Sequence, residues 1–184
     1  MKAKNHLSVL SVCAALAVPS LAVAGGGQIW YQEMKQQANK SSSANAVEAG
    51  NIIEAARKEG TFTTFLRALE TAGMTDVLSR PGSYTVFAPT DAAFDKIASK
   101  DLNDLLNDKD KLRKVLGYHV VEKQKYGWDL RRDALKTMSG GVLQVTQYSS
   151  AEDIKVNLAD VLEANIPASN GVIHAIDEVL FPNS

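Results

Sequence analysis

Two histidines, His119 and His174, carry the side chains best suited to acid–base catalysis or metal binding in this chain. Metal sites draw on clusters with short ligand spacing, and neither histidine lies in such a cluster. Asp177 follows His174 by three positions, so on an extended strand the two side chains point to opposite faces and do not pair. Neither a G-x-S-x-G motif nor a phosphate-binding glycine loop is present in the sequence. The sequence therefore favours hydrogen-bonded core histidines, and it predicts no enzyme, metal site or cofactor.

The stretch around His174 predicts the central strand of a sheet. It runs from Asn170 to Pro182 and reads NGVIHAIDEVLFP. Val172, His174 and Ile176 alternate with Ile173, Ala175 and Asp177, and both faces are largely apolar, which indicates a strand covered on both sides. Asn170-Gly171 is typical of a tight hairpin turn in which glycine adopts a positive φ.

The first residues have the pattern of an export signal. Two lysines precede the apolar run from Leu7 to Leu21, and Ala22-Val23-Ala24 is a small-residue cleavage site. The alternative is a membrane anchor, but the run is short and is interrupted by Pro19. We therefore expect a signal peptide over 1–24, no stable membrane insertion, and an exported protein that is periplasmic or extracellular.

The remaining chain is mildly acidic and lacks cysteine. Cleavage after Ala24 would leave 160 of the 184 residues, remove the single cysteine, Cys13, and leave 18 basic against 21 acidic residues, a net charge of −3. That charge argues against a nucleic-acid partner. Residues 25–50 are rich in Gly, Gln, Ser and Ala and are interpreted as a flexible linker, in which Asn39 begins a glycosylation sequon of low specificity.

Apolar periodicity predicts several short helices after this linker. Ile52, Ile53 and Ala56 form one apolar face, and the helix from Thr61 shows apolar residues at helical spacing. Gly60 and Gly73 are expected to end these two helices. Thr61, Asp101 and Asp108 are expected to cap helices at their first turns.

Three motifs carry a resemblance to a known family. The stretch Tyr84 to Ile97 (YTVFAPTDAAFDKI) contains Thr90 and Asp91, one of which we expect to cap the helix that follows the strand. A Tyr118-His119 pair follows a helix, and Ser169 to Asp177 supplies Asn170, Gly171, His174 and Asp177. In this order and spacing the three motifs resemble those of the fasciclin (FAS1) domain family.

The resemblance implies an α+β fold, a compact β-sandwich or wedge with several short packed helices. It covers residues 51–182 as one domain, and the sequence contains no internal repeat. Tyr118 and the two histidines are interpreted as packing residues of that fold.

Fasciclin-family proteins are associated with adhesion and matrix contact, so the resemblance implies a non-catalytic binding module. Its partner would be a protein or polysaccharide of a cell surface or matrix, and the module a monomer or weak homo-oligomer. Animal members carry an Asp-Ile pair linked to integrin recognition, and Asn165-Ile166 replaces it here. Integrin binding is therefore not carried over. Some algal relatives hold carotenoids, so a carrier of a lipophilic molecule in an apolar groove is the alternative.

Two segments are candidates for partner contact. The first is an expected exposed loop from Glu163 to Ser169, with Asn165, Ile166 and Pro167 at its tip. The second is Tyr126 to Arg132, in which Trp128 and Arg131 are residue types that dominate interfaces. Basic and aromatic residues interleave from Lys123 to Arg132, which fits either a heparin-like or nucleic-acid patch or, as we favour, a solvated loop and short helix.

Overall fold

The computed structural model describes residues 49–130, 134–147 and 154–182. Their helices, including one short 3-10 helix, are α2 (Ile52–Glu59), α3 (Thr63–Ala72), α4 (Thr75–Ser79), α5 (Asp91–Asp95), α6 (Ser99–Asn107), α7 (Lys109–Tyr118) and η1 (Gly127–Asp129). Their strands are β1 (Tyr84–Pro89), β2 (Val120–Val121), β3 (Ala134–Lys136), β4 (Val142–Gln147), β5 (Ile154–Val156), β6 (Ala159–Ala168) and β7 (Gly171–Ile176). This mixture of helices and strands confirms the predicted α+β class.

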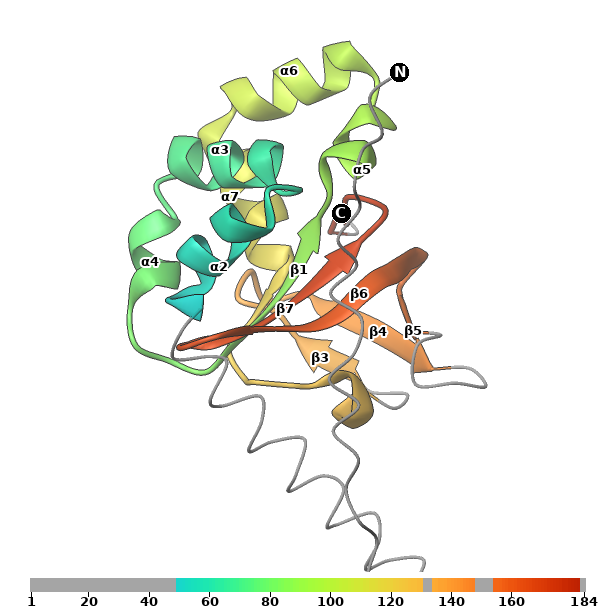
Figure 1. The fold of residues 1–184 in the computed structure, drawn as a ribbon. Helices are drawn as coiled ribbons and strands as arrows, with labels where there is room; N and C mark the ends of the chain where they lie inside the picture. The colour runs from blue at the N-terminus through green and yellow to red at the C-terminus, as the bar shows by residue number, and fades with distance from the viewer. Residues whose placement is uncertain (1–48, 131–133, 148–153, 183–184) are drawn as a thin grey trace, which may run out of the picture. The chain divides into compact units, whose positions relative to one another are not determined.

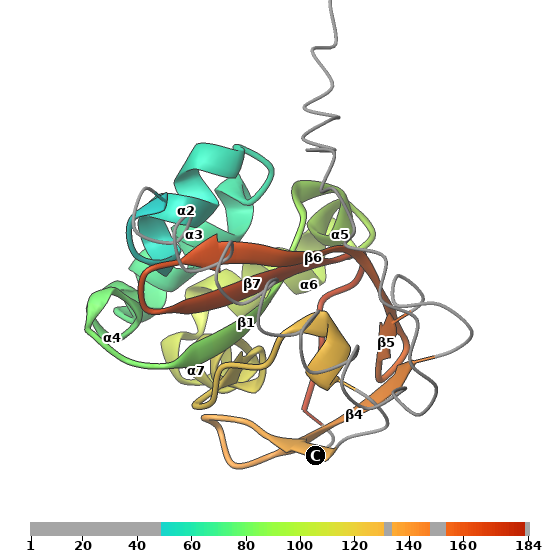
Figure 2. The same ribbon diagram turned by 60° about the horizontal axis from the view of Figure 1, so that its bottom comes forward.

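The strands form one sheet in the order β2-β1-β7-β6-β5-β4-β3. β7 lies parallel to β1 and antiparallel to β6. A single bridge between Val121 and Thr137 brings the two ends of the sheet back together. Figures 1 and 2 show the consequence, because β3, β4 and β5 curl away from the flat part formed by β1, β7 and β6. The helices α2, α3, α4 and α7 gather beside that flat part.

β7 is a central strand, as its two apolar faces predict, and all six of its residues are buried. Its faces belong to two different hydrophobic cores. Ile173 and Ala175 pack in the core shared with the helices, whereas Ile176 packs in the core shared with β3 to β6. Strand alternation thus makes β7 the wall between the two cores.

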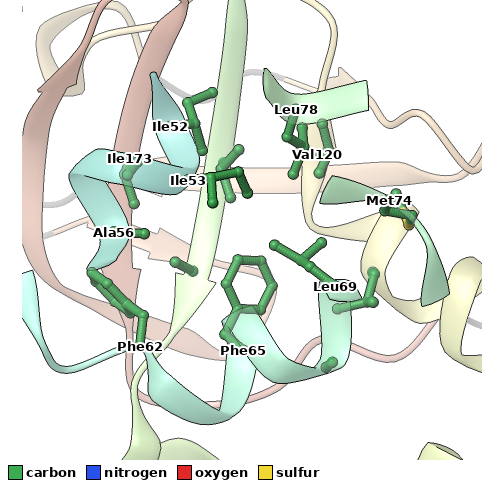
Figure 3. Packing of buried hydrophobic residues seen from close by; sticks show 14 of the residues in the cluster. Ile52, Ile53, Ala56, Phe62, Phe65, Leu69, Met74, Leu78, Val120 and Ile173 are labelled. Carbon is green, nitrogen blue, oxygen red and sulfur yellow. The ribbon is translucent and has the colours of Figure 1, made fainter. Parts of the chain in front are cut away.

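The helical core is built from short amphipathic helices. Figure 3 shows Ile53 of α2, Phe65 of α3 and Ile173 of β7 pointing into the same space. Gly60 and Gly73 end α2 and α3 in left-handed conformations, with φ of 74° and 67°, as expected for glycine after a helix.

Of the capping predictions for α3, α6 and α7, one was right and two were wrong. Asp108 caps α7 by accepting hydrogen bonds from the N–H groups of Asp110 and Lys111. Asp101 does not cap α6, because that helix begins earlier, at Ser99, and places Asp101 within its first turn. Thr61 does not cap α3, since the position before that helix is Phe62 and its cap comes from elsewhere in the fold.

The expected exposed loop from Glu163 to Ser169 was also wrong. β6 continues to Ala168, and Ile166 is 5% exposed and pairs with Ile173. The strand passes Asn165 through an irregularity in which Asn165 takes a left-handed φ of 67°. A bulge absorbs the asparagine without ending the strand, so a pattern that looks like a loop remains part of the sheet.

Several predicted features lie outside the described residues. They are the signal peptide, nearly all of the 25–50 linker with Asn39, and Arg131. These remain predictions.

Candidate functional site

His174 is fully buried and bonded at both ring nitrogens. The N–H of Asn165 donates to Nδ1 at 3.2 Å, so Nδ1 carries no proton. Nε2 therefore carries it and donates to the carbonyl oxygen of Lys125 at 2.9 Å. The ring also stacks on Phe87, with the centroids 5.4 Å apart. This neutral tautomer joins three segments: β7, the irregularity of β6, and the chain before η1.

His119 is also fully buried and has the opposite tautomer. The N–H of Leu180 donates to its Nε2 at 2.9 Å, so Nδ1 holds the proton and donates to the carbonyl oxygen of Val115 at 2.8 Å. Phe65 lies beside it, with the ring centroids 6.3 Å apart. His119 thus ties the end of α7 to the segment that follows β7.

Both rings are held neutral by their surroundings. Burial lowers the pKa of His119 and of His174 from 6.5 to about 4, and the hydrogen bond of each to a backbone carbonyl opposes that shift only in part. With both nitrogens engaged by backbone groups, neither ring has a free nitrogen to offer a substrate or a metal ion.

Asp91 caps a helix other than the one predicted. It is the first residue of α5, and its carboxylate accepts hydrogen bonds from the N–H groups of Thr63 and Thr64, at the start of α3. Burial opposes ionisation of Asp91, but these bonds outweigh it and hold the pKa of the carboxyl group below 3.8. Thr90 precedes α5 without a capping bond from its side chain, and its buried hydroxyl has no partner among the described residues.

Asn170 is a buried tie between distant parts of the fold. Its side-chain oxygen accepts from the N–H of Ile52 at 2.9 Å, and its amide nitrogen donates to the carbonyl oxygens of Leu78 and Arg80. One side chain thereby fixes the start of α2 and the end of α4 against the sheet.

Gly171 requires glycine for a reason other than the predicted one. Ser169 and Asn170 form the two-residue connection, and Gly171 already belongs to β7 without a positive φ. A Cβ at this position would collide with the carbonyl oxygen of Tyr84 and lie 2.9 Å from a side-chain carbon of Ile52. The close approach of β1 to β7 excludes a side chain here.

Tyr118 and Asp177 also bond within the fold. The hydroxyl of Tyr118 donates to the carbonyl oxygen of Val142 at 2.9 Å. Asp177 accepts from Lys96 Nζ and from the N–H of Asp160, both at 2.8 Å. Burial opposes ionisation of Asp177, and these two bonds outweigh it, so its pKa falls below 3.8.

The structure separates the candidate partner-contact residues. Asn165 Oδ1 accepts from the N–H of Gly127 at 2.6 Å, so Asn165 is engaged with the chain before η1. Ile166 is in the helical core, and Pro167 is half-buried within β6. The backbone of Trp128 lies in η1, but its side chain, like all of Arg131, is outside what the structure describes.

A cleft of about 460 Å³ lies where the two ends of the sheet meet. It is lined by the segments 121–125 and 134–137, specifically Val121, Glu122, Lys123, Lys125, Ala134, Leu135, Lys136 and Thr137. Sequence analysis placed Lys123 and Lys125 in a basic segment, for which a solvated loop was favoured over a heparin-like or nucleic-acid patch, and it missed Lys136. One residue in the sequence could have indicated this cleft: Thr85 is polar although it lies in the apolar strand YTVFA. Its hydroxyl bonds to the backbone on one side of the cleft.

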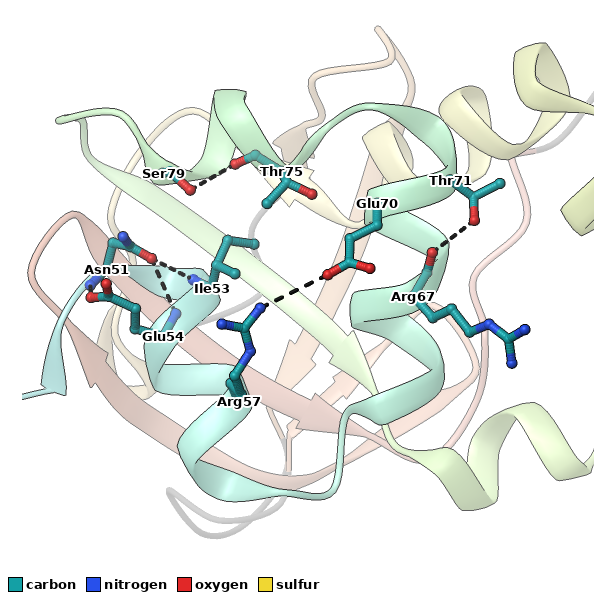
Figure 4. A network of polar contacts seen from close by, with 9 residues as sticks. All are labelled: Asn51, Ile53, Glu54, Arg57, Arg67, Glu70, Thr71, Thr75 and Ser79. Atoms are coloured by element: carbon teal, nitrogen blue, oxygen red, sulfur yellow. Dashed lines mark hydrogen bonds and ion pairs between the residues drawn. The ribbon is translucent and has the colours of Figure 1, made fainter.

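A smaller hollow of about 270 Å³ lies between α2 and α3. Arg57 of α2 and Glu70 of α3 both line it, and their side chains reach toward each other in Figure 4, with a separation of 3.8 Å between Nη2 and Oε1. Both side chains are well exposed, so this pair contributes little to stability.

At the start of α2, the Asn51 side chain and Glu54 form a reciprocal capping box.

Two further features are absent from the described part of the chain. No group of three or more His, Cys, Asp or Glu residues is arranged to hold a metal ion there. Across the same residues, no helix has the length and apolar character needed to cross a membrane.

Comparison with known proteins identifies the fold. The model of the fasciclin domain family matches residues 60–182. Protein sll1483 of Synechocystis is 35% identical over 170 residues, covering 91% of this chain and 90% of that protein. The pig transforming growth factor-beta-induced protein ig-h3 is 35% identical over 134 residues, which cover 72% of this chain but 19% of ig-h3.

A solved structure agrees with these sequence matches. The FAS1 domain pair of the insect cell adhesion molecule fasciclin I has a TM-score of 0.57, with 21% identity, over 67% of this chain and 46% of that one. At this identity the match establishes the fold alone. The family match, the two relatives and the shared fold agree, and they confirm the resemblance seen in the three motifs: the chain belongs to the fasciclin domain family.

Proposed function

We propose that this protein is an exported, non-catalytic binding module that contacts a cell surface or extracellular matrix. The observation that carries the proposal is the use of the motif side chains. Asp91, Asn170 and His174 all bond to backbone groups inside the fold. Because these polar side chains already bond to the backbone, we expect partner recognition to involve other residues, on the surface of the domain.

The relatives support the same direction. The matching fold comes from an insect cell adhesion molecule, and ig-h3 contains a segment 35% identical to this domain.

The lipophilic-carrier alternative requires an apolar groove. The larger of the two cavities described above has three lysines and a glutamate in its lining, and the smaller one has two arginines and a glutamate. Charged linings of this kind favour a polar ligand over a carotenoid or lipid.

Trp128 and Arg131 remain proposed contact residues. Trp128→Ala should weaken binding to the partner without lowering the melting temperature if the indole lies in the interface. A lower melting temperature with binding unchanged would assign Trp128 to the fold.

The function is tested with the exported protein, purified from its source cells. After fluorescent labelling, it should bind intact source cells in a saturable manner and be displaced by unlabelled protein. The purified protein should carry no pigment or lipid in stoichiometric amount. Absence of saturable binding, together with a lipophilic molecule bound at one per chain, would replace the adhesion proposal by the carrier.

A further inference from the structure

We infer that the cleft between residues 121–125 and 134–137 binds an acidic polysaccharide. This inference deepens the proposed function by naming the chemical class of its partner, and it rests on that function. It gives a role to the first lysines of the basic segment that begins at Lys123.

One side of the cleft is held in place by buried groups. The hydroxyl of Thr85, a residue with no exposed surface, donates to the carbonyl oxygen of Lys123 at 2.6 Å and accepts from the N–H of Lys125 at 2.8 Å. His174 holds the carbonyl oxygen of Lys125 from the other side. The backbone that carries these two lysines is therefore anchored to both β1 and β7.

The second side is held by the sheet. Leu135 of β3 pairs with Leu143 of β4, and the N–H and hydroxyl of Thr137 both donate to the carbonyl oxygen of Gly141. Leu135 is buried while Lys136 is exposed, as strand alternation requires. The bridge between Val121 and Thr137 joins the two sides at one end, and the structure describes no further strand pairing between them.

The charge of this cleft is opposite to that of the chain. Three lysines and one glutamate line it, whereas the full chain has a formal net charge of −1. Lys123 and Lys136 are exposed, and neither forms an ion pair with another described residue. Two unpaired ammonium groups from separate segments of a fixed cleft attract an anionic ligand.

The lining also discriminates between classes of anion. No aromatic side chain is among the lining residues given above, so the cleft has no platform on which nucleic-acid bases would stack. Val121 and Leu135 are 2% and 4% exposed and offer little surface to the apolar anchors on which peptide interfaces depend. Each lysine presents a compact positive charge, unlike arginine, whose planar guanidinium group binds one anion through two parallel hydrogen bonds. An acidic polysaccharide, with repeated charges and no apolar side chains, matches this lining.

The test measures binding of the purified full chain to alginate, a polyuronate, with neutral dextran and poly-glutamate as comparison polymers. We expect binding to alginate that weakens as NaCl rises, because salt shortens the range of charge interactions. The variant Lys123→Gln/Lys136→Gln should bind alginate about fivefold more weakly, which corresponds to two exposed ion pairs. The matched control is Lys100→Gln/Lys111→Gln, which removes the same charge from exposed positions on α6 and α7 and should keep wild-type affinity.

The inference is overturned by three results. They are no binding to alginate, equal loss in both double variants, and binding to poly-glutamate as strong as to alginate. Binding of the same variants to source cells separates this inference from the proposed function. If wild type and the cleft variant bind cells equally well, the adhesion function stands and the cleft assignment falls; if neither binds cells, the adhesion function itself falls.

Discussion

The carbonyl oxygen of Lys125 lies 2.9 Å from Nε2 of His174, and this contact connects the buried centre of the sheet to its open cleft. Nδ1 of the same ring accepts from Asn165, so the proton on Nε2 is fixed. The histidine of the third motif therefore acts through position: it holds the backbone of a surface lysine.

His174→Ala should lower both stability and alginate affinity. Removing a buried hydrogen-bonding partner costs about 1–3 kcal/mol, and in a protein of this size that lowers the melting temperature by roughly 2–10 °C. The matched control is His119→Ala, which should lose similar stability but keep alginate affinity, because His119 bonds to Leu180 rather than Lys125. Equal alginate binding by the two variants at a temperature where both are folded would contradict the link to the cleft.

Stability should fall as pH drops from 6.5 toward 4. Both histidines have a folded-state pKa near 4 and a reference value of 6.5, so in this window the unfolded chain binds protons that the folded chain does not. The neutral rings thus contribute stability fully above pH 6.5, and each loses about 1.4 kcal/mol per pH unit through the window. Urea unfolding at pH 7 and pH 5 measures this. A variant with His174→Gln should show about half the slope, and a flat profile in wild type would contradict neutral burial.

Asp91→Ala should destabilise the protein through α3. Loss of a capping side chain costs about 0.5–2 kcal/mol, and here two N–H groups lose their acceptor. Asp95, exposed in the same short helix, supplies the control Asp95→Ala, which removes the same charge and no described hydrogen bond. The free energies of unfolding of the two variants, measured in urea, should differ by the energy of the lost capping bonds. Identical unfolding curves would refute the assignment of Asp91 as the cap of α3.

Gly171→Ala should prevent normal folding, because its Cβ would overlap the carbonyl oxygen of Tyr84 and separate β1 from β7. Gly140→Ala is a useful contrast. Its Cβ would meet nothing within 4 Å, although its φ is 90°, so we expect a loss of about 1–2 kcal/mol. Yield of soluble protein and circular dichroism compare the two. Native-like Gly171→Ala would show that the strands can separate without cost.

The exported protein should begin at Gly25, since the apolar run and Ala22-Val23-Ala24 predict cleavage after Ala24. Intact mass of the protein recovered outside the cytoplasm measures the cleavage site. Retention of Met1 in a membrane fraction would contradict the export prediction.

Sequence patterns predicted the elements better than their contacts. The two apolar faces of Val172 to Ile176 predicted a central strand, and Gly60, Gly73 and Asp108 were correctly placed at helix ends. These features depend on local periodicity and backbone conformation, which a sequence displays directly.

The remaining features depend on residues distant in sequence. Asp91 caps α3 across 27 positions in the chain, and Gly171 is required by the approach of Tyr84. Asn165 and Pro167 suggested a loop because no local pattern shows that a bulge carries β6 past them. The cleft was missed because Lys123 and Lys136 become neighbours of one cavity only when the two ends of the sheet meet.

We propose that this fasciclin domain is an adhesion module with no catalytic role. Attachment of the source cells to a surface is measured after deletion of the gene, and again with the wild-type gene restored in a second strain. Deletion should reduce attachment and the wild-type gene should restore it, whereas the Lys123→Gln/Lys136→Gln gene should restore it less well than its Lys100→Gln/Lys111→Gln control. Unchanged attachment in the deletion strain, with a lipophilic compound missing from its exported fraction, would show that the protein is a carrier and not an adhesion module.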